Sequence, residues 1–260
     1  MFSNLFRNIS PVVKNLLLIN VIFYIAQWTF PSLMQNLELY PFISENFKPW
    51  QLATHFFMHS PVSIGHIFFN MFALVIFGTQ LERVWGPQRF LIYYMACAFG
   101  AAILHQIVIQ IEISALKDYL SNEQWYIIKD NGHNIYNDLV FEKKREISHY
   151  VNQYGLDLNN NDSLVPVIMK MNTAMIGASG AVFGLLAAFG YLFPNTELML
   201  LFPPIPIKAK YFVVGYALIE LYLGFSNNPG DNVAHFAHLG GALIGILMVL
   251  YWQKGKTNFF

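Results

Sequence analysis

Three stretches of the sequence carry side chains that together could perform acyl transfer. Ser179 and His238 lie in separate apolar stretches, and a serine oxygen hydrogen-bonded to an imidazole is an activated nucleophile. In a third stretch His66 and Asn70 are four residues apart, so on a helix they share one face. Both can donate hydrogen bonds, which acyl transfer needs where negative charge develops on oxygen. The pattern predicts Ser179 as nucleophile, His238 as general base, and His66 and Asn70 as oxyanion donors.

The stretches around Ser179 and His238 are also rich in glycine, which lets helices approach closely in a membrane. The glycines at helical spacing are Gly180 and Gly184 after the serine, and Gly241 and Gly245 after the histidine. We therefore expect the two helices to pack closely enough for the two side chains to meet. The nearest acid to His238 in the sequence is Asp231, two turns away, so the pattern favours a Ser–His dyad over a triad.

The elements that hold these residues are predicted by the distribution of charge along the chain. Of the 260 residues, 55% are apolar and 12% are charged, whereas about 25% charged is typical of soluble domains. A transmembrane helix needs about 20 predominantly apolar residues. Six segments are long enough and carry no charge except Glu220: 15–37, 49–81, 90–111, 171–196, 211–230 and 232–253. The fold class predicted is an all-α integral membrane protein with six transmembrane helices in a lipid bilayer.

Composition also excludes other classes. The 15 basic and 15 acidic side chains cancel, so no basic excess exists to bind a nucleic acid backbone. The single cysteine, Cys97, permits neither an intramolecular disulfide nor a site of several cysteines for a metal. We therefore expect no nucleic acid partner.

A polar insertion separates the third and fourth predicted spans. Residues 112–169 carry nine acids and five bases, with scattered apolar residues that indicate one or two short helices. This organisation predicts three parts: 1–111 with helices one to three and the first loop, the extracytoplasmic insertion 112–169, and 170–260 with helices four to six. We interpret the insertion as a solvated segment without chemistry of its own.

Lys and Arg in the short connections set the expected orientation. Arg83 and Arg89 lie between the second and third spans, and Lys208 and Lys210 lie between the fourth and fifth. We therefore expect a multi-pass protein of the bacterial inner membrane, with both termini cytoplasmic.

Taken together, these motifs resemble the rhomboid family of intramembrane serine proteases. The resemblance rests on Gly177-Ala178-Ser179-Gly180, on Ala237-His238-Leu239-Gly240-Gly241 with Gly245, on His66-x-x-x-Asn70, and on Gly78-x-x-Leu81-Glu82-Arg83. It implies cleavage of peptide bonds in membrane-anchored protein substrates, without metal or cofactor. It also implies that His66, Asn70 and the Ser179 backbone amide stabilise the oxyanion. In the first loop Trp50 is followed by Gln51, where the family often has arginine.

Two alternatives compete with this interpretation. His55-x-x-x-His59 and His235-x-x-His238 faintly resemble the histidine boxes of di-metal membrane oxygenases and desaturases. An inactive relative that only binds transmembrane segments is the other alternative, although such relatives usually lack the serine or the histidine.

The remaining polar residues of the spans receive structural interpretations. We expect His55 and His59 to support the first loop and His105 to be structural. Glu220 is expected to be a buried acid that is hydrogen-bonded or protonated rather than catalytic.

Overall fold

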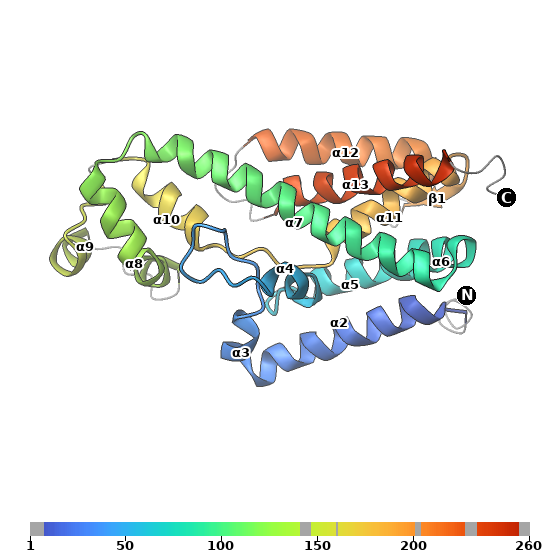
Figure 1. The fold of residues 1–260 in the computed structure, drawn as a ribbon, viewed down its shortest axis with the longest axis horizontal. Coiled ribbons are helices and arrows are strands. Elements are labelled where there is room, and N and C mark those ends of the chain that lie inside the picture. The colour runs from blue at the N-terminus through green and yellow to red at the C-terminus, as the bar shows by residue number, and fades with distance from the viewer. Residues whose placement is uncertain (1–7, 141–146, 160, 201–203, 227–232, 255–260) are drawn as a thin grey trace.

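The computed structural model describes residues 8–140, 147–159, 161–200, 204–226 and 233–254, which form a helical bundle with one small hairpin (Figure 1). The helices are α2 (Pro11–Thr29), α3 (Pro31–Gln35), α4 (Gln51–Thr54), the 3₁₀ turn η1 (His55–Phe57), α5 (Ile64–Ala73), the π turn η2 (Leu74–Gly78), α6 (Thr79–Trp85), α7 (Pro87–Lys117), α8 (Asn122–Val140), α9 (Ile147–Tyr154), α10 (Leu164–Asn172), α11 (Ser179–Leu192), α12 (Ala209–Ser226) and α13 (His235–Gln253). Strands β1 (Glu197–Met199) and β2 (Pro206–Lys208) pair antiparallel.

Four of the described helical segments are long and apolar enough to cross a membrane: Pro11–Thr29, Ile64–Trp85, Pro87–Lys117 and His235–Gln253. The all-α membrane fold is therefore confirmed, whereas the count of six spans is not. The fourth predicted span contains α11, which is apolar but has only 14 residues. The fifth contains α12, which carries Lys210 and Glu220.

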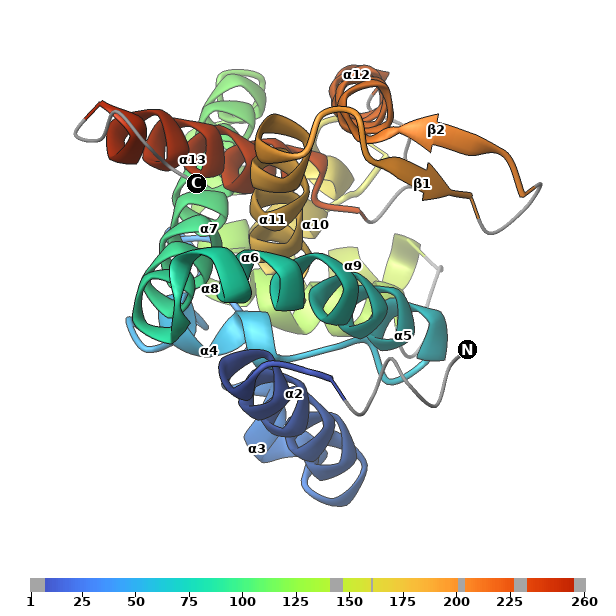
Figure 2. The same cartoon turned by 90° about the vertical axis from the view of Figure 1, so that its right-hand side faces the viewer.

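Helix α11 lies at the centre of the bundle, against α7, α12 and α13 and against the continuous helix from α5 to α6 (Figure 2). Every residue from Gly180 to Gly190 is buried. A helix this short and apolar is stable here because neighbouring helices cover its whole circumference.

The predicted glycine stripe is what brings α11 and α13 together. A Cβ atom at Gly241 would collide with the backbone of Gly180, and one at Gly245 would lie 3.0 Å from Cα and the carbonyl oxygen of Gly184. That carbonyl also accepts a buried hydrogen bond of 2.7 Å from the Tyr93 hydroxyl on α7. The two backbones approach closely at these points because the glycines there carry no side chains.

The start of α11 differs from the prediction. The charge-free segment 171–196 predicts one helix, but α10 ends at Asn172 and residues 173–177 are not helical. Met175 pairs with Leu39 of the first loop, and the Gly177 N–H donates to the His55 carbonyl at 3.0 Å. These backbone partners replace the helical ones, so the new helix begins at Ser179 itself.

The first loop is organised around Gln51, the residue that departs from the family pattern. Its buried side chain accepts hydrogen bonds from the backbone N–H groups of Tyr40 and Lys48, and it donates to the carbonyls of Asn36 and Asn46. The Gln51 side-chain amide thereby links four backbone positions of the first loop to one another.

Glu82, from the motif that follows α5, has a structural role at the opposite end of the bundle from the insertion. Its buried carboxylate accepts hydrogen bonds of 3.0 Å from the Val12 and Val13 N–H groups, in the first turn of α2. These N–H groups have no partner within their own helix, and a carboxylate also complements the helix dipole there. Glu82 thus fixes α2 to α6.

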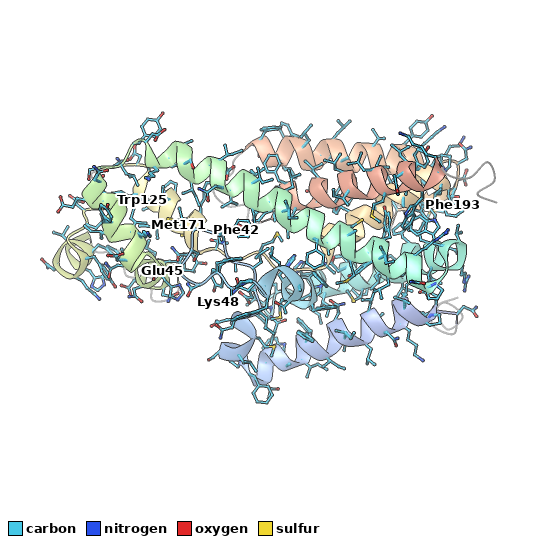
Figure 3. All side chains as sticks on the ribbon, in the orientation of Figure 1. Phe42, Glu45, Lys48, Trp125, Met171 and Phe193 are labelled. Atoms are coloured by element: carbon cyan, nitrogen blue, oxygen red, sulfur yellow. The ribbon has the colours of Figure 1, made fainter. Side chains whose placement is uncertain are left out.

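The insertion is more ordered than predicted. Instead of one or two short helices it contains α8, α9 and α10, of which α10 packs on α7 and on α8, and α9 packs on α8. Their shared core includes Ile113, Ile128, Ile135, Tyr150, Leu164 and Ile168, all nearly inaccessible. Trp125 and Met171, labelled in Figure 3, belong to the same cluster. Amphipathic helices folding onto one another and onto α7 account for this order, because together they bury an apolar core.

Candidate active site

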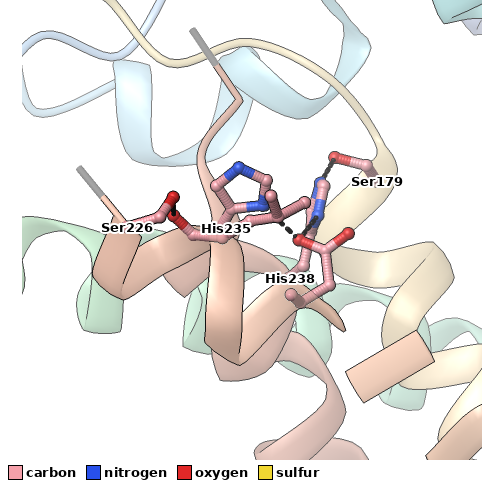
Figure 4. Close-up of polar contacts among 6 residues, drawn as sticks. Ser179, Ser226, His235 and His238 are labelled. Carbon is pink, nitrogen blue, oxygen red and sulfur yellow. Dashed lines mark hydrogen bonds and ion pairs between the residues drawn. The ribbon is translucent and has the colours of Figure 1, made fainter. Parts of the chain in front are cut away.

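Ser179 and His238 meet across the contact between α11 and α13. Ser179 is the first residue of α11, and His238 lies in the first turn of α13. The Ser179 Oγ is 2.8 Å from the His238 Nε2, as Figure 4 shows. The imidazole stacks on Phe183, with ring centroids 4.3 Å apart and an angle of 6° between the rings. This stacking holds the ring plane so that Nε2 faces the serine.

Glu220 of α12 contacts the other side of His238. The Glu220 Oε2 is 2.8 Å from the His238 Nδ1 and 2.6 Å from the His235 Nδ1. All three residues are at least nine-tenths buried. The expectation that Glu220 is a hydrogen-bonded buried acid agrees with this geometry. The expectation that no carboxylate accompanies the serine and histidine does not, because the acid comes from a different helix. Asp231, the acid considered from the sequence, lies outside the described residues.

His66 lies beside Gly177, immediately before the serine. Gly177 has φ +115°, where side chains are strained, and a Cβ there would lie 2.7 Å from the His66 Nε2. The His66 Nδ1 faces the Ser60 N–H at 3.2 Å and must therefore accept from it. A neutral His66 consequently carries its proton on Nε2, the atom directed at Gly177. Glycine at position 177 leaves room for that donor.

Asn70 lies one turn further along α5. Its side-chain amide donates to the His66 carbonyl at 2.8 Å, and the residue is buried. The bond that the structure gives to Asn70 is thus to its own helix. The Ser179 N–H belongs to the first turn of α11, where N–H groups lack intrahelical acceptors. A Cβ at Gly177 would also lie 3.7 Å from the Ser179 Oγ, so the His66 ring and the serine side chain border the same space beside Gly177.

The other histidines lie around this centre. The His55 ring contacts the Gln51 carbonyl at 2.9 Å, and the His55 carbonyl holds Gly177, so His55 joins the first loop to the serine segment. The His59 backbone exchanges hydrogen bonds with the side chain of Gln27 on α2. Burial lowers the pKa of His55 to about 4 and that of His59 to about 3. His105 is half-buried on α7.

The side chains that could bind a metal do not match the predicted histidine boxes. Within the described part of the chain, the one cluster of three or more metal-type side chains is Glu220, His235 and His238. Its nitrogen and oxygen atoms are within hydrogen-bond distance of one another, and His55 and His59 are not part of it. A di-metal oxygenase requires a second set of ligands that the described residues do not assemble.

Sequence reasoning missed Glu220 and Phe183 as neighbours of His238. The signal for Glu220 was present, because a lone carboxylate in an apolar segment needs a partner. Its partner could not be identified without knowing how α12 packs on α13.

A sequence model of one known family matches most of this chain. The family is described as Rhomboid domain, and the match covers residues 46–113 and 153–254. The intervening residues lie within the insertion.

Individual relatives agree with the family match. An uncharacterized mitochondrial rhomboid protein of Schizosaccharomyces pombe is 28% identical over 210 residues, which is 78% of this chain and 50% of the relative. RHOMBOID-like protein 12, mitochondrial, of Arabidopsis thaliana is 27% identical over 220 residues, 83% of this chain and 51% of the relative. Rhomboid protease GluP of Bacillus subtilis is 39% identical over 54 residues, 21% of this chain and 10% of the relative. The chain spans about half the length of the first two relatives.

These names correct one expectation. The relatives that match most of the chain are named mitochondrial, so the predicted bacterial inner membrane is wrong, and with it the placement of the termini in a bacterial cytoplasm. The multi-pass membrane character stands.

Proposed function

Because the chain belongs to the rhomboid family, we propose that it is a serine endopeptidase that cleaves membrane-anchored proteins in or near their transmembrane segments. The observation that carries the proposal is the 2.8 Å contact between the Ser179 Oγ and the His238 Nε2, made at the buried ends of two closely packed helices. Nucleophile and base within hydrogen-bond distance are the requirement for covalent catalysis by serine.

In the proposed reaction the Ser179 Oγ attacks the carbonyl carbon of the scissile bond while its proton passes to the His238 Nε2. The carbonyl oxygen becomes negative and accepts hydrogen bonds from the His66 Nε2–H and the Ser179 backbone N–H. Asn70 donates to the same oxygen through the N–H that it does not use for the His66 carbonyl, since an amide nitrogen carries two donors. His238 then protonates the departing amine, and a water molecule attacks the acyl-enzyme by the same route.

The position of the serine within the bundle supports substrates that are themselves within the membrane. α11 is surrounded by four other helical segments, and Ser179 at its start is half-buried. We infer a mitochondrial membrane as the site of action, on the basis of the relatives' names. The proposal needs neither a metal nor a cofactor.

The proposal is tested by reconstituting the full chain in liposomes with a panel of single-span model substrates and analysing the products by mass spectrometry. We expect cleavage by the wild type, and loss of cleavage in Ser179→Ala and in His238→Ala. The double variant should be no worse than either single variant, because residues that act as one unit are not additive. Cleavage that persists in Ser179→Ala would overturn the proposal.

The same experiment addresses the two alternatives. Wild type that binds the substrates without ever cleaving them would favour the inactive relative. Activity that is lost on chelation, together with stoichiometric metal in the purified protein, would favour the oxygenase.

A further inference from the structure

We propose that Glu220 is a positioning residue for His238, so that the working unit is Ser179–His238–Glu220, with His235 holding the carboxylate in place. This inference rests on the proposed function, because it assigns a partner to the base of that reaction. It changes the predicted dyad into a relay of three side chains from three helices, α11, α13 and α12.

The burial of Glu220 is the first argument. Among the described side chains of α12, only Ala209 and Glu220 are buried, while Val214, Leu218 and Leu221 on the same helix are exposed. A carboxylate within an apolar helix is costly unless it is paired. Glu220 is turned towards α13, and its partners are the two histidines of that helix. The single acid of the helix therefore points at the predicted base rather than away from it.

The assignment of protons is the second argument. One oxygen, Oε2, lies within hydrogen-bond distance of the Nδ1 atoms of both His235 and His238. A carboxylate oxygen accepts, so each imidazole donates through Nδ1–H. His238 in its neutral form then has no proton on Nε2, and this nitrogen accepts the Ser179 hydroxyl at 2.8 Å. Glu220 thus selects the tautomer that a general base requires.

The same contact acts as the reaction proceeds. When the Ser179 Oγ forms its bond to the substrate carbonyl carbon, the hydroxyl proton moves to the His238 Nε2 and the ring becomes a cation. The proton on the His238 Nδ1 stays on the ring and keeps its hydrogen bond to Glu220, so no proton moves to the carboxylate. The charge pair that results is buried, where its attraction is stronger than in water. His235 donates to the same oxygen and keeps the carboxylate from rotating away.

The competing explanation is that Glu220 only ties α12 to α13. A structural tie would affect folding and the amount of active protein, but not the protonation of the base. The pH–rate profile distinguishes the two, and the groups that face His238 must be named for it: Glu220 of α12, His235 of α13, Ser179 of α11, His66 of α5 and His105 of α7. Only Glu220 is negative at neutral pH.

The test compares Glu220→Gln, Glu220→Asp and wild type as the full chain in liposomes, with EDTA present throughout. The glutamine side chain keeps the shape and an acceptor oxygen but removes the charge. We expect kcat to fall by about 10²- to 10⁴-fold with KM nearly unchanged. The acid limb of the kcat profile should move to lower pH, because the ring has lost its stabilising anion. Glu220→Asp should recover part of kcat.

A matched control is Glu82→Gln, which neutralises another buried carboxylate that ties two helices without contacting the site. It should lower thermal stability and leave the pH profile of the folded protein in place. His235→Ala should retain measurable activity, because Glu220 still contacts His238.

The outcomes separate this inference from the proposed function. If the wild type cleaves and Ser179→Ala does not, but Glu220→Gln keeps the wild-type kcat, the role given to Glu220 is wrong while the proposed protease activity stands. A lower kcat with an unmoved pH profile and no recovery in Glu220→Asp also overturns it, in favour of a structural tie. A wild type without activity would instead overturn the proposed function.

Discussion

The contact between α11 and α13 and the core of the insertion are packed in different ways. Between α11 and α13 two points of contact are formed by glycine backbones, Gly241 against Gly180 and Gly245 against Gly184. Between α7, α8, α9 and α10 the contact consists of large side chains such as Ile128, Ile135 and Tyr150. Backbone contact fixes the distance between helices within narrow limits, whereas large side chains can repack. The bundle therefore has the packing that can hold a serine and a histidine 2.8 Å apart, and the insertion does not need it.

The match to the family follows this division only in part. It covers residues 46–113 and 153–254, so it leaves out the residues between 113 and 153 but includes α10 and does not reach α2. The insertion is nevertheless connected to the site. The Asn46 side chain of the first loop lies 2.8 Å from the His133 ring on α8, and α10 leads directly into the extended segment before Ser179. The insertion thus contacts the first loop and leads into the segment that carries Ser179.

Substitution of Gly241 should disturb the contact between α11 and α13 most strongly. Gly241→Val should abolish cleavage, because the added side chain collides with the Gly180 backbone and separates α13 from α11. Gly215→Ala on α12 is the matched control, since nothing lies within 4 Å of a Cβ there. It should be neutral or stabilise the protein by up to about 1 kcal/mol. Cleavage assays and thermal unfolding of both variants check this, and an active Gly241→Val would show that close backbone contact is not required.

The next effect concerns the oxyanion donors on α5. His66→Ala should lower kcat by about 10²- to 10³-fold while leaving KM nearly unchanged, because the donor acts on charge that exists only in the transition state. Asn70→Ala should behave similarly, and the double variant should lose less than the product of the single losses if both serve one oxygen. Steady-state kinetics of the three variants measures this. Unchanged rates in both single variants would remove α5 from the mechanism.

The insertion can be disturbed separately from the bundle. Ile128→Ala removes a fully buried side chain of α8 and should weaken the insertion by about 2–5 kcal/mol. The kcat of the folded protein should change by only about twofold, because distant sites couple weakly. Hydrogen exchange resolved to peptides 122–140 measures the first effect, and Tyr126→Ala, at an exposed position on the same helix, is the control. Complete loss of activity in Ile128→Ala would mean that the insertion sets the site geometry.

The smallest effect concerns acid stability. His59 is buried, its Nε2 has no hydrogen-bond partner among the residues that the structure describes, and burial lowers its pKa to about 3. The unfolded chain, with an ordinary histidine pKa near 6.5, therefore binds more protons than the folded protein between these values. Stability is full above pH 6.5 and is lost as pH falls towards 3. Between pH 7 and pH 5, the free energy of unfolding should fall by up to about 2 kcal/mol less in His59→Phe than in wild type. Unfolding at both pH values measures this, and equal losses would contradict it.

The two regions also differ in how well the sequence predicts them. The bundle was predictable because charge-free segments and the stripe from His238 to Gly245 indicate buried helices directly. The start of α11 at Ser179 was not, because an uncharged apolar run such as 171–178 is compatible with either helix or extended chain. The insertion was predicted to hold one or two short helices rather than three, because short amphipathic helices of mixed composition give a weak periodic signal. The contact between Glu220 and His238 depends on tertiary packing, which no local pattern contains.

In the proposed mechanism, the packing of α11 on α13 lets His238 activate Ser179 as a nucleophile. To test this, the reconstituted full chain is treated with a fluorophosphonate probe and the label is located by mass spectrometry. We expect one label, on Ser179, that is absent in Ser179→Ala and strongly slowed in His238→Ala. Labelling of another serine, or labelling of Ser179 at an unchanged rate in His238→Ala, would contradict it.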